Sequence, residues 1–150
     1  MEAEVYPDER VIRFILDNFI PVRAHIKEQP EVFSRFRASW TPTQIFLDKD
    51  GVERYRIEGF LPVEDFLAQL EMGLGRLKFE REDYEGAERA FHDVCDGHPR
   101  AGAAAEACYW AGVAAYKARH TAEPLAETAK LLRERYPESE WTKKASVWAG

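Results

Sequence analysis

The chain has 150 residues, 45% of them hydrophobic and 13% aromatic, so it can bury the core of one ordinary domain or of two very small ones. Its formal net charge of −6 is spread over both halves without a basic cluster, which argues against nucleic acid as a partner. No apolar run approaches the roughly 20 residues of a membrane helix, and the N-terminal residues 1–4 lack the features of a secretory signal. The sequence as written therefore predicts a cytoplasmic protein with no membrane partner.

The N-terminal part has an α/β pattern. Over residues 7–59 the hydrophobic period changes in the order helix, strand, helix, strand, strand. The predicted elements are a helix capped by Asp8, a strand over residues 20–26, a short helix around residues 32–36, and a hairpin with strands at 43–48 and 52–58. Gly51 lies in the hairpin turn, where a positive φ is needed.

The C-terminal part has a purely helical pattern that nearly repeats. Gly75 and Gly112 are 37 residues apart, and Pro99 and Pro137 are 38 residues apart. Small residues where helices cross, with a proline closing each unit, resemble two tetratricopeptide repeats. The amphipathic residues 141–148 are then expected to form a capping helix.

The two cysteines, Cys95 and Cys108, occur in the helical part. Their spacing suits neither a disulfide framework nor a Cys-x-x-Cys pair, so we expect two buried thiols. A zinc site is the alternative, because His92, Cys95 and His98 recur at three-residue intervals. We favour the thiols and predict no metal ligand, because Gly97 ends the helix and should turn His98 towards solvent.

A Thr-Pro pair, Thr41-Pro42, stands at the head of the first hairpin strand, although proline cannot donate a ladder hydrogen bond. Three stretches resemble the thioredoxin fold: Trp40-Thr41-Pro42-Thr43, Phe46-Leu47-Asp48 with its Lys49-Asp50-Gly51 turn, and Ile57-Glu58-Gly59-Phe60-Leu61-Pro62. The first 22 residues also resemble the stretch that follows the active site in the disulfide-reductase branch of that family.

This resemblance implies a cis peptide bond before Pro42 and a loop whose backbone pairs with an extended peptide. The implied substrate- or peptide-binding residues are Trp40, Thr41, Pro42 and Gly59. The alternative is that Pro42 only shapes the turn into the strand. The expected fold is α/β and then all-α, with an incomplete thioredoxin-like lobe over residues 1–74 and a tetratricopeptide-like array over residues 75–150.

The resemblance also implies a redox Cys-x-x-Cys pair about three residues before Met1, with the central strand of the sheet before it. Because neither is among these 150 residues, we predict no catalytic residue and no cofactor for this chain. The strands expected at 20–26 and 43–48 would lose the strand between them. We therefore expect a homodimer to cover the sheet.

Two functions remain from the sequence. In the first, the chain is a module for self-association or for binding a protein or peptide partner. In the second, it is the C-terminal part of a thiol–disulfide oxidoreductase of cell redox homeostasis, whose Cys-x-x-Cys lies upstream of Met1. An upstream signal could then direct the protein to the periplasm.

Overall fold

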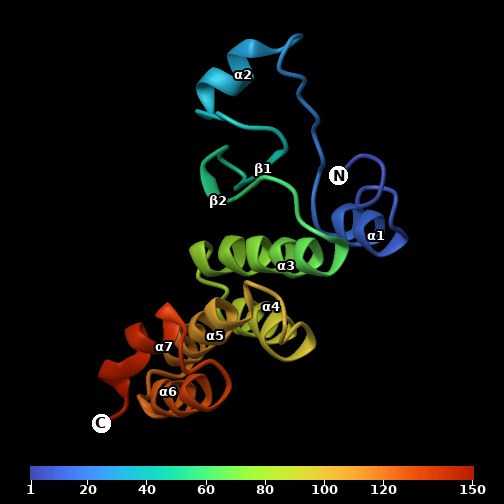
Figure 1. Cartoon of the computed structure of the whole chain (residues 1–150). Helices are drawn as coiled ribbons and strands as arrows, with labels where there is room; N and C mark the ends of the chain where they lie inside the picture. The colour runs from blue at the N-terminus through green and yellow to red at the C-terminus, as the bar shows by residue number, and fades with distance from the viewer.

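The computed structural model describes all 150 residues as a two-stranded sheet, seven α-helices and one short 3₁₀ helix. The elements are α1 (Glu9–Asn18), α2 (Pro30–Arg35), β1 (Thr43–Leu47), β2 (Glu53–Glu58), α3 (Val63–Glu80), α4 (Tyr84–Gly97), α5 (Ala104–Arg119), α6 (Glu123–Arg135), α7 (Glu140–Ala145) and a 3₁₀ helix (Ser146–Trp148). The hairpin lies between α2 and α3, and α4 to α7 stack on the other side of α3 (Figure 1). None of these helices is long and apolar enough to span a bilayer.

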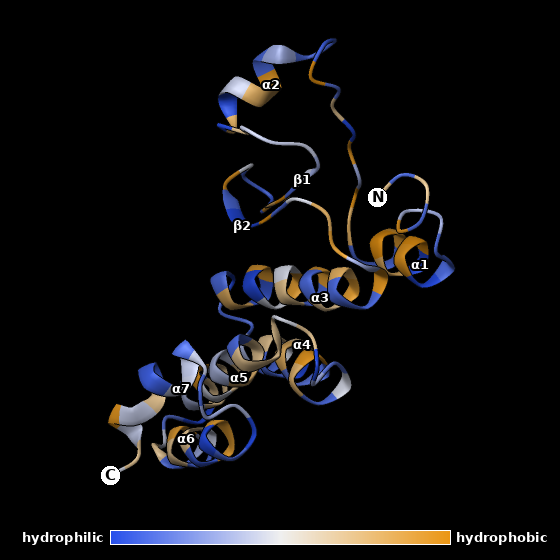
Figure 2. Cartoon of the chain, in the orientation of Figure 1, coloured by the Kyte–Doolittle hydropathy of each residue, from blue (hydrophilic) through white to orange (hydrophobic).

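Helix α1 begins as predicted, because the Asp8 carboxylate accepts the backbone N–H of Arg10 at 2.9 Å and so caps the first turn. Its apolar stripe is only partly used. Val11 is fully buried, whereas Ile12 and Leu16 remain exposed. Phe14 and Ile15 are partly buried against the same core, so the helix covers part of its apolar side chains and leaves others exposed. Figure 2 shows the ribbon of α1 largely in orange.

The strand predicted over residues 20–26 is wrong. These residues follow α1 as an irregular segment that pairs with no strand, and Ile20 and Val22 are 93% and 89% exposed. Alternating apolar residues give a strand its two faces, but the strand exists only when a neighbour receives its backbone hydrogen bonds. No neighbour is present here, so the segment passes the sheet without joining it (Figure 1).

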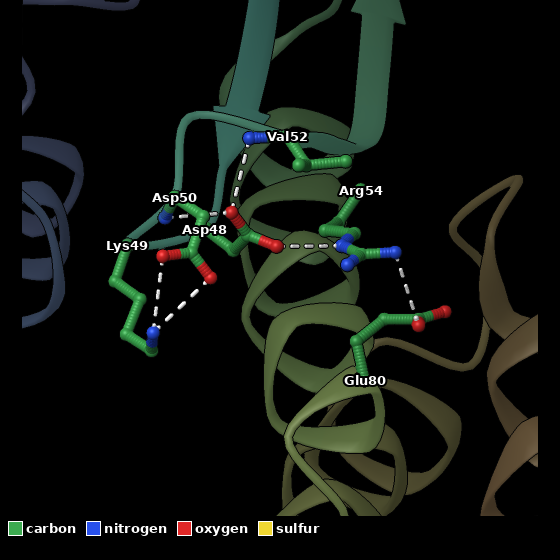
Figure 3. Close-up of polar contacts among 6 residues, drawn as sticks. All are labelled: Asp48, Lys49, Asp50, Val52, Arg54 and Glu80. Atoms are coloured by element: carbon green, nitrogen blue, oxygen red, sulfur yellow. Dashed lines mark hydrogen bonds and ion pairs between the residues drawn. The ribbon is translucent and has the colours of Figure 1, made fainter.

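The predicted hairpin is confirmed. Strands β1 and β2 pair antiparallel, with Thr43 opposite Glu58, and Gly51 has a φ of 76° in the turn. The Asp48 carboxylate accepts the backbone N–H of Val52 at 3.0 Å and pairs with Arg54 at 2.8 Å. These hydrogen bonds hold the pKa of Asp48 below its ordinary value. Figure 3 shows how this network closes the turn.

Helix α3 belongs to two hydrophobic cores at once. Phe66 and Leu70 lie in the core under the sheet, whereas Ala68 and Met72 lie in the core of the helical half. The helix is continuous, so the boundary expected between residues 74 and 75 lies inside it. Arg54 also ties the hairpin to the end of α3 by an ion pair with Glu80 at 3.3 Å (Figure 3).

The prediction of two free thiols is wrong, because Cys95 and Cys108 form a disulfide. Cys95 lies on α4 and Cys108 on α5, which pack side by side, and the Cα atoms of the two cysteines are 5.0 Å apart. That separation is within the range of a disulfide. With both sulfurs bonded to each other, no thiolate remains for the zinc alternative, and no other group of side chains could hold a metal ion.

His98 also differs from expectation, because it is mostly buried and does not point to solvent. Its ring nitrogens lie 3.7 Å from a Glu64 oxygen and 3.8 Å from a Glu71 oxygen. Burial, with a smaller contribution from nearby Asp93, raises the pKa of Glu71 to about 7.

The C-terminal end closes the helical half with aromatic side chains. Tyr109 on α5 stacks on Trp148 with ring centres 4.6 Å apart and contacts Trp141 at 5.1 Å. Arg76 of α3 lies over the ring of Trp110 at 4.3 Å. The capping segment expected at residues 141–148 is thus present as α7 and the 3₁₀ helix.

Candidate functional site

The candidate site is the loop that enters β1. The Thr41–Pro42 peptide bond is cis. The Gly59 backbone N–H donates to the Pro42 carbonyl at 2.8 Å, and the Thr43 hydroxyl donates to the Trp40 carbonyl at 2.8 Å. Gly59 has a φ of 91°, which favours glycine at this position. The structure therefore brings the four residues predicted for this site onto one local backbone scaffold.

Two aromatic side chains stand at this loop and are largely exposed to solvent. Trp40 precedes Thr41 and is 67% exposed, and Phe60 follows Gly59 and is 54% exposed. Phe60 was not among the predicted site residues. It could have been found from its place directly after the glycine. Exposed aromatic side chains on a rigid loop are typical of protein-binding surfaces.

The outer edge of β1 is open. Because β1 pairs only with β2, one side of its backbone has no partner strand. Pro42 and Gly59 form a hydrogen-bonded pair at the loop, and such pairs alternate with non-hydrogen-bonded pairs along an antiparallel ladder. The backbone N–H and C=O groups of Gln44 and Phe46 therefore point to β2. The backbone N–H and C=O groups of Thr43 and Ile45 point away from β2. This edge can therefore accept an added strand.

One face of β1 packs against the hydrophobic core. Phe46 is buried against Gly73 of α3. The Gln44 side chain lies on the same face of β1 and donates to the Tyr6 hydroxyl at 2.6 Å. Its other polar atom, Oε1, is buried without a hydrogen-bond partner. The core thus fixes β1 in place through this face and leaves its outer backbone edge available.

Further exposed aliphatic side chains occur in the same half of the chain. They belong to α1 and to the segment that follows it: Ile12, Leu16, Ile20, Val22 and Ile26. The ribbon of α1 and parts of this segment are orange in Figure 2. Where such groups form a contiguous patch, they are available to contact another chain.

The N-terminal half contains no thiol. Both cysteines of the chain lie in the helical half, where the Cys95–Cys108 disulfide is buried between α4 and α5. A disulfide exchanges when a thiolate reaches one of its sulfurs, and burial prevents that approach. The described residues therefore offer no accessible group for disulfide chemistry at the Thr41–Pro42 loop.

Comparison with known proteins gives one match. Residues 1–73 match the model of the thioredoxin-like domain. No curated protein and no solved structure matches the chain. The matched residues contain the loop, the hairpin and the first part of α3. This match supports a thioredoxin-like domain in the first half of the chain.

Proposed function

We propose that the chain is a protein-interaction module that binds an extended segment of a partner along β1, beside the Thr41–Pro42 loop. The open backbone edge of β1 carries this proposal. An added strand would satisfy the free groups of Thr43 and Ile45, and Trp40 and Phe60 would cover its apolar side chains. Because backbone pairing supplies much of the contact, the module should tolerate many partner sequences.

A second copy of this chain is one such partner. Two β1 strands can pair antiparallel across a two-fold axis, which joins both hairpins into one four-stranded sheet. The exposed aliphatic side chains of α1 and residues 20–26 would then be available to the same interface. A monomer in sedimentation at micromolar concentration, with a cooperative melt, would rule out this homodimer and leave a heterologous segment as the partner.

The helical half is proposed to be a tetratricopeptide-like array that supports this module. Two equivalent close contacts support the assignment. A Cβ added to Gly75 would meet the ring of Phe91, and one added to Gly112 would meet Thr128, which is in both cases sixteen residues further along the chain. The same glycine contact thus occurs at both helix crossings, as repeated units require.

The binding proposal is tested with random linear peptides displayed on phage, selected on the full chain and then measured by fluorescence anisotropy. The variant Ile45→Pro removes an edge N–H of β1 without removing a ladder bond to β2. Its matched control is Glu58→Pro, which removes an N–H on the outer edge of β2. We expect Ile45→Pro and Trp40→Ala each to weaken binding about tenfold or more, while Glu58→Pro binds normally. Peptides that bind all three variants equally would refute the site.

A thiol–disulfide oxidoreductase is the second candidate function. It is favoured by the unpaired segment at residues 20–26 together with the open edge of β1, because a central strand supplied from upstream would cover both. In the thioredoxin fold such a strand leads into the Cys-x-x-Cys pair. The buried disulfide of the helical half adds support for the periplasmic alternative, because disulfides persist mainly in oxidising compartments.

The genomic DNA upstream of Met1 separates the two functions. An apolar strand followed by Cys-x-x-Cys, in frame and within about ten codons of Met1, is expected if the protein is an oxidoreductase. A stop codon in that interval would refute this function. The chain as given should not reduce insulin, since its disulfide is buried, and turnover by these 150 residues would contradict the assignment of the site.

A further inference from the structure

A cavity lies between the C-terminal end of α2 and the hairpin. Its volume is about 550 Å³, and it is lined by Arg35, Phe36, Arg37, Gly51, Glu53 and Arg56, which we call the arginine pocket. Three of the lining residues are arginines and one is a glutamate. This concentration of positive charge stands out in a chain whose net charge is −6.

Arg56 already has partners for its charge and its donors. Its guanidinium pairs with Glu53 at 2.6 Å and with Glu58 at 3.2 Å. It also donates to the backbone carbonyls of Phe36 and Arg37, which follow the last turn of α2. Arg56 therefore caps the C-terminal end of α2, and its two carboxylate partners balance its charge.

Arg35 and Arg37 have no acidic partner. Neither side chain takes part in an ion pair or a hydrogen bond. The Arg35 guanidinium lies over the Phe36 ring at 5.2 Å and reaches across to the hairpin turn, 3.9 Å from the place of a Cβ on Gly51. Two arginines without an acidic partner therefore line the same cavity, and the guanidinium of Arg35 lies over an aromatic ring.

The backbone at Arg37 is an unusual place for an arginine. Its φ is 52°, in the left-handed region that glycine and asparagine adopt most easily. Arg37 directly follows the C-cap of α2, and the next residue, Ala38, donates its N–H to the Phe33 carbonyl at 2.9 Å. The left-handed backbone therefore ends the helix, as it does at Glu82 and His120, and it fixes where the Arg37 side chain starts.

We propose that the arginine pocket binds a small oxyanion, either a phosphate or a carboxylate group of a ligand, through Arg35 and Arg37. Guanidinium groups match both oxyanions because their N–H donors form a planar fork. Arg56 would hold the far wall without contributing a free charge. This site is independent of the β1 edge, so it can exist whether or not the interaction module is correct.

Isothermal titration of the full chain with pyrophosphate, and separately with the tricarboxylate tricarballylate, tests the proposal at low salt. We expect a dissociation constant on the order of 1 mM for at least one probe. Which probe binds identifies the phosphate or the carboxylate source. Added salt should weaken the binding, because both guanidinium groups are exposed to solvent. No binding of either probe would refute the proposal.

The double variant Arg35→Gln/Arg37→Gln is expected to lose binding at least tenfold. Its matched control, Arg100→Gln/Arg133→Gln, removes the same charge from two exposed arginines outside the pocket. Equal losses in both double variants would show a general charge effect and refute the site.

The variant Arg37→Gly removes the Arg37 side chain without the risk that lost binding only reflects a destabilised fold. Glycine relieves the left-handed backbone, so the melting temperature should rise by roughly 2–4 °C while oxyanion binding falls. Unchanged binding by this more stable variant would show that Arg37 does not contact the anion and would overturn the proposal.

Discussion

Reduction of the Cys95–Cys108 disulfide is expected to lower the free energy of unfolding by about 3 kcal/mol. The bond closes a loop with a sequence separation of 13, and opening it restores conformational freedom to the unfolded chain. Both cysteines are buried in the core of the helical half, so the reduced sulfurs also have to pack as two thiols. Urea unfolding with and without a reductant measures the difference.

The double variant Cys95→Ala/Cys108→Ala is the control for direct effects of the reductant. It should be less stable than the oxidised chain and insensitive to reductant. Alkylation of the denatured, unreduced protein gives an independent check: two labelled thiols per chain would show that the bond is absent, and no label is expected.

The hairpin was predictable because its signals are local. Gly51 in the turn, the alternation after it and Asp48 before it specify one short antiparallel pair. The cap of α1 by Asp8 is equally local. The four residues of the Thr41–Pro42 loop were found through the resemblance to the thioredoxin fold, which is a comparison of motifs and not a result of periodicity.

The two main prediction errors are the strand at residues 20–26 and the free thiols. In both, the outcome depends on a structural partner that the local sequence does not specify. The alternation at residues 20–26 is real, but no strand is present to pair with it, so the backbone cannot form a ladder. Cys95 and Cys108 approach only because α4 and α5 pack side by side, and their spacing along the chain does not fix that register. The arginine pocket was missed for the same reason, since α2 and the hairpin meet only in the folded chain.

Gly73→Ala is expected to destabilise the protein by about 2–3 kcal/mol. A Cβ at this position of α3 would lie 2.3 Å from the Phe46 ring. That ring cannot move freely, because it packs edge-on against Phe19 at 5.3 Å and Tyr55 at 5.7 Å. The helix would therefore be pushed away from β1, which weakens the attachment of the candidate site to the core. Chemical unfolding measures the loss.

Gly97→Ala is the matched control, because a Cβ there meets nothing within 4 Å and the residue is also helical. Alanine should be neutral or stabilising by about 0.5 kcal/mol at that position, since it lowers the entropy of the unfolded chain. The double variant Gly73→Ala/Phe46→Leu should recover part of the loss, because a smaller side chain makes room for the methyl group. If the two single changes were simply additive, the close approach of α3 to Phe46 would not be what requires glycine at position 73. The sheet and the helical half would then share α3 without this contact holding β1 in place.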